Sequence, residues 1–147
     1  MQKIADLLDR PHVVPGLDAG DKASLLAELA RRAALALKRD EPAIRDALEA
    51  RERLGSTGVG RGVAIPHARL HGLAQPFGLF ARIEPPIDFG AIDGQPVDLV
   101  FLLLTPETGA SHLPALAAIS RLLRDADVAR GLRVAANARD IYETLTA

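Results

Sequence analysis

Cysteine is absent from this sequence of 147 residues. Its absence excludes disulfide bonds, thiolate catalysis and cysteine-based metal sites, and a cytoplasmic location is the simplest interpretation. Long apolar runs are also absent, since the longest extends only from Leu99 to Leu104. A membrane-spanning helix needs ~20 apolar residues, so we expect a chain that is not embedded in a membrane.

An excess of charge of either sign is missing too, because the formal net charge at pH 7 is −1. This balance gives no electrostatic reason to expect binding to nucleic acid or to an anionic membrane. The segment from Met1 to Asp9 places acidic residues around a weak apolar stripe, which argues against a signal peptide. No repeat, low-complexity tract or long linker is visible, so residues 1–147 are predicted to form a single domain.

Two amphipathic helices are predicted in the first third of the chain. One covers about residues 21–38, after a capping signal at Asp18–Asp21. The other begins after Asp40, with Pro42 in its first turn, and ends at Gly55.

The second of these helices carries an arginine on its apolar side. Its apolar stripe includes Leu48, and the next position of the stripe, three residues later, is Arg51. Burying an unpaired charge is costly, so two interpretations stay open. Either the side-chain stem packs and the guanidinium reaches solvent, or the guanidinium binds an anion at a site.

The second half of the chain alternates strands and helices. Strands are predicted at 77–83 and 97–105, and the latter is nearly all apolar, as expected of a central strand covered on both faces. The remaining predictions are a helix over about 112–124 capped by Ser111, a short helix from Asp125, a short strand at 132–135 and a C-terminal helix capped by Asn137. This mixture indicates an α/β layered fold.

A glycine-rich stretch from Gly55 to His67 is the most informative motif. Its glycines allow positive φ and close approach to a ligand, and successive N–H groups in such a loop favour an anion; they are Gly55, Gly58, Gly60 and Gly62. Residues 63–65 are predicted as a short strand that Pro66 stops, which places His67 at the carboxyl end of a strand. The stretch lacks the lysine and the Ser/Thr of a P-loop and the spacing of a dinucleotide fingerprint.

The four histidines differ in their surroundings. His12 and His71 lie in polar segments that we expect to be exposed, and no metal site is predicted, since Pro66 disfavours a helix that could pair His67 with His71. His112 opens a predicted helix after the loop 105–111, where the helix N-terminus favours the neutral imidazole. From its position alone, His112 is either a second site residue or a simple cap.

Three side chains from different elements therefore converge on one kind of chemistry. Arg51, His67 and His112 each lie at or near an end where open α/β sheets bind ligands. A neutral imidazole attacks phosphorus without a strong base, and an arginine with loop amides stabilises charge on the transferring oxygens. The set suits a site that accepts and donates phosphoryl groups.

The sequence resembles the enzyme IIA proteins of the bacterial phosphoenolpyruvate-dependent phosphotransferase system, in the mannitol/fructose/nitrogen-regulatory family. The stretch from Arg51 to His67 carries the resemblance, and residues 91–104 are most similar to the nitrogen-regulatory branch. The resemblance implies a three-layer fold with a mixed sheet between helices, and phosphate uptake from a histidine phosphocarrier protein. Two small departures are Ala68, where glycine is frequent, and a slightly short loop over 105–111.

The family also implies roles for individual residues. His67 corresponds to the histidine phosphorylated on its tele nitrogen, Arg51 to the site arginine and His112 to the second site histidine. Phosphate-binding positions are expected in the glycine-rich stretch, at Thr57, Gly58, Gly60 and Gly62. No cofactor and no metal are expected.

The resemblance leads to one expected function and two alternatives. Nitrogen-branch members regulate partners, such as potassium-transport and sensor-kinase proteins, according to their phosphorylation state, and we expect the same here through an apolar surface around the site. A first alternative is the IIA component of a fructose/mannitol-type sugar transport system that passes phosphate to a IIB partner. A second, of another class, is an interaction module that never carries phosphate.

Overall fold

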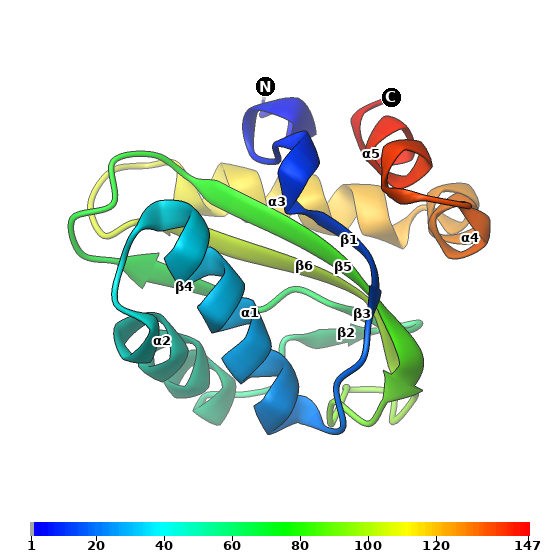
Figure 1. The fold of residues 1–147 in the computed structure, drawn as a ribbon, viewed down its shortest axis with the longest axis horizontal. Coiled ribbons are helices and arrows are strands. Elements are labelled where there is room, and N and C mark those ends of the chain that lie inside the picture. Colours follow the sequence, from blue (N-terminus) through cyan, green and yellow to red (C-terminus); the bar gives the residue numbers. More distant parts are fainter. Residues whose placement is uncertain (1) are drawn as a thin grey trace.

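A computed structural model describes residues 2–147 (Figure 1). The chain begins with two short 3₁₀ turns at Ile4–Asp6 and Arg10–His12. The strands are β1 (Val13–Leu17), β2 (Gly58–Gly60), β3 (Val63–Ala64), β4 (His67–Leu70), β5 (Phe77–Ile87) and β6 (Val97–Pro106). The helices are α1 (Lys22–Leu37), α2 (Glu41–Arg53), α3 (His112–Arg124), α4 (Ala126–Val134) and α5 (Ala138–Thr146).

The strands form one mixed sheet with β6 near its centre. The order is β1-β5-β6-β3-β2, and β4 also pairs with β6. β5 runs antiparallel to β6, whereas β3 and β4 both run parallel to it, and β1 runs parallel to β5. β2 forms a hairpin with β3 at one edge of the sheet.

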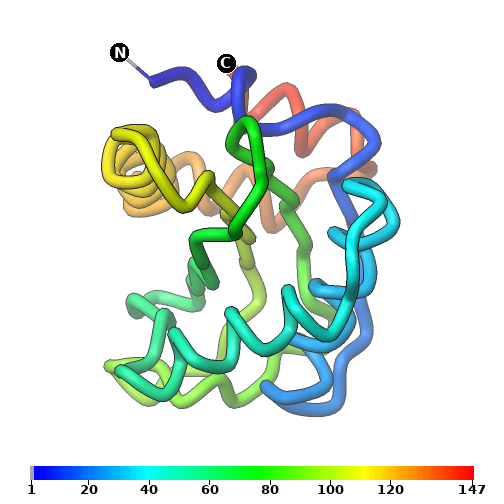
Figure 2. The backbone as a smooth tube through the Cα atoms, turned by 90° about the vertical axis from the view of Figure 1, so that its left-hand side faces the viewer, coloured from blue at the N-terminus to red at the C-terminus, as the bar shows by residue number. Residues whose placement is uncertain are grey.

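Helices cover both faces of this sheet, as Figures 1 and 2 show from two directions. One buried cluster joins α1 and α2 to the sheet, and a second joins α3, α4 and α5 to the opposite face. Alternate residues of β6 enter different clusters: Leu102 and Leu104 belong to the first, Phe101 and Leu103 to the second. This two-sided burial explains the apolar run, and it confirms the predicted three-layer α/β fold.

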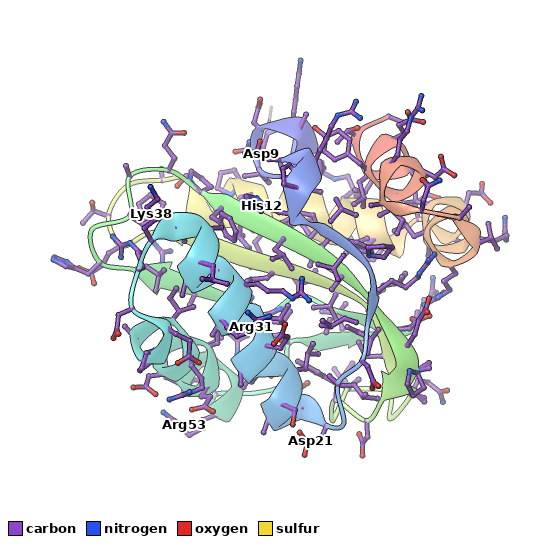
Figure 3. The ribbon with its side chains drawn as sticks, viewed as in Figure 1. Asp9, His12, Asp21, Arg31, Lys38 and Arg53 are labelled. Atoms are coloured by element: carbon purple, nitrogen blue, oxygen red, sulfur yellow. The ribbon has the colours of Figure 1, made fainter. Side chains whose placement is uncertain are left out.

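Some helix starts follow the predicted capping chemistry and others do not. Asp21, at the first turn of α1 in Figure 3, accepts from the Ser24 amide at 2.7 Å, and Asn137 accepts from the Asp140 amide at 2.9 Å. Asp40 and Ser111 occupy the predicted N-cap positions of α2 and α3, but their side chains make no capping hydrogen bond.

One further prediction is corrected, and one strand was missed. Residues 132–135 form no strand, because α4 continues to Val134. The strand β1 was not predicted, since Pro15 and Gly16 interrupt its pattern at the edge of the sheet. The Arg82 guanidinium secures both segments by donating to the carbonyl oxygens of Pro15 and Leu132, each at 2.9 Å.

The two histidines outside the predicted site behave differently from each other. His71 is exposed, as expected. His12 is half-buried, with its ring centroid 4.8 Å from that of Phe77, so its predicted exposure is wrong (Figure 3). Within residues 2–147, no helix is both long enough and apolar enough to cross a membrane.

Candidate functional site

His67 begins a strand, where the sequence predicted the end of one. Val63 pairs with Leu99 and His67 with Leu103, so an advance of four residues from β3 to β4 matches an advance of four residues along β6. The chain therefore stays extended through Pro66, which interrupts the ladder without turning the backbone. The predicted strand end is corrected accordingly, since β4 continues to Leu70.

The two ring nitrogens of His67 have different partners. Nδ1 lies 2.7 Å from the carbonyl oxygen of Ile65, which can only accept, so Nδ1 carries the proton. Nε2 accepts a hydrogen bond from Arg51 Nε at 3.2 Å. Arg51 is held in turn by donation from Nη1 to the carbonyl oxygen of Gly55 at 2.8 Å. The unprotonated, nucleophilic nitrogen of His67 is therefore Nε2.

The electrostatic environment favours the neutral form of His67. Burial lowers the pKa of His67 below the usual 6.5, and the nearby positive charge of Arg51 lowers it further. The hydrogen bond to the Ile65 carbonyl and the charge of Glu52 oppose this shift without cancelling it. His67 thus keeps its lone pair at pH values where a free histidine begins to protonate.

His112 lies beside His67 at the start of α3, with the two ring centroids 5.4 Å apart. Its Nδ1 is 2.6 Å from the hydroxyl oxygen of Thr105, which is completely buried at the end of β6. Among the described residues, that hydroxyl oxygen has no other hydrogen-bond partner. Donation from Thr105 to Nδ1 therefore satisfies the buried hydroxyl and leaves Nε2 of His112 protonated, as a donor.

The pKa of His112 is also lowered, first by burial, then by the positive charge of Arg69, and by repulsion from His67 whenever that ring is protonated. The neutral imidazole predicted at this helix N-terminus is therefore confirmed in direction, although burial is the main cause. Thr105 was not predicted as a site residue. The signal available in the sequence was a single hydroxyl at the end of an apolar run.

Arg69 is a second site residue that sequence reasoning missed. His67 and Arg69 are two residues apart on β4, so their side chains leave the sheet on the same face. Both line a pocket of about 360 Å³ together with Arg51, Leu54 and His112. The alternation of buried Ala68 and Leu70 with these polar residues was the available signal, but the predicted stop at Pro66 obscured it.

The predicted glycine positions do not join this pocket. The turn between β2 and β3, residues 60–62, is called the hairpin tip. It lies at the other end of β6, because the carbonyl oxygen of Gly62 accepts from the Asp98 and Leu99 amides. From Val63 to His67 the extended chain covers about 13 Å at 3.3 Å per residue. Gly60 and Gly62 thus form a turn remote from His67, and Gly58 packs against Ala91.

The anion at this loop is a carboxylate of the same chain. The amide of Arg61 donates to Asp93 Oδ2 at 2.9 Å, and the hydrogen bonds from Arg61 and Gln95 lower the pKa of Asp93. Arg61 itself has φ of 57°, a conformation that the sequence had suggested for glycine only. The sequence predicted that this loop binds an anionic ligand, whereas in the structure the Arg61 amide binds a carboxylate of the same chain.

Thr57 supports His67 through the backbone. Its amide donates to Glu52 Oε1 at 3.1 Å and its hydroxyl to Glu52 Oε2, while Lys22 Nζ lies 2.7 Å from Oε1. The carbonyl oxygen of Thr57 accepts from the Ile65 amide at 3.0 Å, and Ile65 holds His67. Both donors of Thr57 are committed to Glu52, so the structure gives this residue a positioning contact.

The arrangement as a whole can bind and transfer a dianion. Arg51 donates to His67 Nε2, Arg69 and His112 line the same pocket, and no carboxylate of residues 2–147 hydrogen-bonds either ring. No group of three or more His, Asp or Glu side chains within that range could hold a metal ion. Such a site can stabilise a phosphoryl group with cationic and imidazole donors.

Comparisons with known proteins place the chain in a family. Residues 6–147 match a family model described as "Phosphoenolpyruvate-dependent sugar phosphotransferase system, EIIA 2". A "Nitrogen regulatory protein" from Bradyrhizobium diazoefficiens is 52% identical over 143 residues, which cover 97% of this chain and 94% of the relative.

Solved structures share the fold. The nitrogen regulatory protein IIA-Ntr from Neisseria meningitidis superimposes with a TM-score of 0.88 at 34% identity, covering 97% of this chain and 99% of the other. Enzyme IIAMTL from Escherichia coli, solved in a complex with phosphorylated enzyme IIBMTL, superimposes with a TM-score of 0.78, covering 95% and 98%. At 16% identity, this second likeness concerns the fold alone.

Proposed function

Since the chain belongs to the EIIA 2 family of the phosphoenolpyruvate-dependent sugar phosphotransferase system, we propose that it is a phosphotransferase carrying phosphate on His67 Nε2. Residues 1–147 act as one IIA type 2 domain in this proposal. The observation that carries it is the fixed tautomer of His67, whose Nδ1 proton is held by Ile65 while Nε2 meets Arg51.

The proposed step is an exchange of one N–P bond for another. The lone pair of His67 Nε2 bonds to phosphorus while the bond from phosphorus to the donor's histidine nitrogen breaks. The electron pair of the broken bond leaves with the donor imidazole. His67 keeps its Nδ1 proton, so its ring becomes positive, and the Ile65 carbonyl stabilises that charge.

The residues around His67 have separate roles in this step. Arg51, already 3.2 Å from Nε2, moves its hydrogen bond to an oxygen of the arriving phosphoryl group. His112 donates from Nε2 to a second oxygen, with Thr105 holding its ring. Thr57 and Glu52 position Ile65, and thereby His67, and do not touch phosphate.

The phosphoryl donor is a histidine phosphocarrier protein that docks on an apolar rim. Leu54, which lines the pocket, is 84% exposed, and Leu113, next to His112, is 68% exposed. Exposed leucines beside a polar centre are typical of a docking surface. Phosphorylation adds about two negative charges to this rim, so a partner that packs on it binds the two forms with different affinity.

Nitrogen regulation is the biological role that this proposal favours, supported by the 52% identity to a nitrogen regulatory protein. Its targets include potassium-transport or sensor-kinase proteins, reached in the cytoplasm. Both the targets and the location are predictions from the family resemblance.

Phosphate uptake by matched variants tests the proposal. With phosphoenolpyruvate, the general phosphotransferase enzyme and a phosphocarrier, the wild-type protein and His71→Ala should each take up one acid-labile phosphate. His67→Ala should take up none while keeping its unfolding temperature. Stoichiometric uptake by His67→Ala would eliminate His67 as the acceptor, and no uptake by the wild type would leave the interaction-module alternative.

A second candidate, sugar transport, is supported by the fold shared with IIAMTL, which was solved with phosphorylated IIBMTL. The acceptor chemistry is the same in both cases, so only the onward step distinguishes them. Phosphorylated protein should be mixed with a IIB domain of the fructose or mannitol type. Rapid phosphate loss to IIB would favour transport, and a stable phosphorylated protein would favour regulation.

A further inference from the structure

A cleft at the hairpin end of the molecule carries two arginines that form no salt bridge within residues 2–147. This hairpin-tip cleft lies between the β2–β3 turn and the second half of α3 and has a volume of about 250 Å³. Its lining includes Val59, Arg61, Val63, Ser120, Leu123 and Arg124. Both arginines are exposed, and neither guanidinium pairs with a carboxylate among residues 2–147.

The nearby carboxylates are already committed to other groups. Asp93 accepts from the Arg61 amide, and Asp98 binds Arg133 Nε at 2.8 Å. Asp125 accepts from the Asp127 and Val128 amides at the start of α4. Within residues 2–147 none of these three carboxylates pairs with the guanidinium of Arg61 or Arg124, so both guanidinium groups can pair with carboxylates of another molecule, although the whole protein has a formal net charge of −1.

The hairpin tip presents this charge on a fixed backbone. Arg61 adopts φ of 57°, which is costly for a residue with a side chain. Its amide is held by Asp93 at 2.9 Å, and its carbonyl oxygen accepts from Arg133 Nη2 at 2.8 Å. Because the backbone of the hairpin tip is already fixed, it loses little conformational entropy when a partner binds.

Exposed apolar side chains lie in the cleft and at the neighbouring hairpin. Val59 is 48% exposed in the cleft, and Ile92, which is 83% exposed, lies beside the hairpin at Gly60. Exposed apolar side chains next to arginines are characteristic of protein interfaces. The cleft is smaller than the ~300 Å³ at which small-molecule pockets begin, so it fits one side chain of a partner.

We propose that the hairpin-tip cleft is a second docking site, for a partner segment with one apolar side chain between acidic residues. The apolar side chain enters the cleft and packs on its floor at Val63 and Leu123, which are both buried in the core, and flanking carboxylates pair with Arg61 and Arg124. The segment stays clear of the phosphorylation site, because α3 spans about 18 Å between His112 and Arg124 at 1.5 Å per residue. The site binds whether or not His67 carries phosphate.

Peptide selection tests this proposal without relying on His67. A random 12-residue peptide library displayed on phage is selected against the whole protein, and the enriched peptides are synthesised for affinity measurements. Arg61→Asn keeps a residue that tolerates positive φ, so it removes the guanidinium without adding strain. Arg53→Ala, on the outer side of α2 in Figure 3, is the matched control.

We expect enriched peptides to carry acidic residues around an apolar one. Their affinity should fall roughly tenfold or more with Arg61→Asn and with Arg124→Ala, and should be unchanged with Arg53→Ala and His67→Ala. No enrichment, peptides without acidic residues, or equal binding to the arginine variants would overturn the proposal. Self-association of the protein that Arg61→Asn abolishes would assign the cleft to a second copy and would also overturn it.

Discussion

At the Val97 end of β6, the backbone of the hairpin tip is held by carboxylates of its own chain, through Asp93 on the Arg61 amide and Asp98 on Arg133. At the Pro106 end, the His67 site contains two guanidinium groups and two imidazoles, and no carboxylate among residues 2–147 is hydrogen-bonded to either ring. The glycine-rich tip is the end that looks suited to an anion, yet its amide is occupied. A transferable phosphoryl group needs donors that the chain leaves free, and these lie around His67.

The largest effect short of removing His67 is expected from Arg51→Ala. Loss of its charge-assisted contact should cost about 2–4 kcal/mol of transition-state stabilisation, roughly 30- to 1000-fold in transfer rate. Single-turnover transfer from the phosphorylated carrier measures this rate, with Arg53→Ala as the control. An unchanged rate would show that the two ends of β6 do not differ in the way described.

Variants of His112 and of Thr105, which holds the His112 ring, should slow phosphoryl transfer by smaller and graded amounts. His112→Ala removes a donor to a charged oxygen and should slow transfer roughly 10- to 100-fold, whereas His112→Gln keeps a donor of similar reach and should lose less. Thr105→Val leaves the ring but frees its orientation, and we expect about a 2- to 10-fold loss. Equal, near-wild-type rates for all three variants would reduce His112 to a helix cap.

The pH dependence of stability should report the same site. The pKa values of His67 and His112 are lowered by burial, so below pH 6.5 the unfolded chain binds more protons than the folded one. Stability is therefore lost as pH falls through this window and recovers as it rises. Urea unfolding from pH 5 to 8 measures the loss, which should shrink in the double variant His67→Gln/His112→Gln. An equal loss in that variant would place the titrating groups elsewhere.

The smallest effect on transfer is expected at the other end of β6. Asp93→Ala frees the Arg61 amide for an external anion, but the tip is remote from His67. Transfer rates should stay within about twofold of wild type, as for a surface substitution away from the site. A rate change as large as that of Arg51→Ala would instead return the glycine-rich tip to the phosphate site.

Local chemistry explains how far the sequence could predict this structure. The apolar run of β6 indicated a covered central strand, and the spacing of α2 indicated that Arg51 faces inward. Pro66 was misleading, because a proline can sit between two strand segments that share one neighbour, and β4 with Arg69 was missed for this reason. The position of the hairpin tip depended on its pairing with the start of β6, which no local pattern encodes.

The nitrogen that carries phosphate tests the central claim most directly. Protein labelled with ¹⁵N-histidine and phosphorylated through the carrier should be examined by NMR for coupling between phosphorus and the imidazole nitrogens. We predict phosphate on Nε2 of His67 alone, with Nδ1 still protonated against the Ile65 carbonyl. Phosphate on Nδ1, or on any other histidine, would contradict the assignment of Nε2 as the nucleophile.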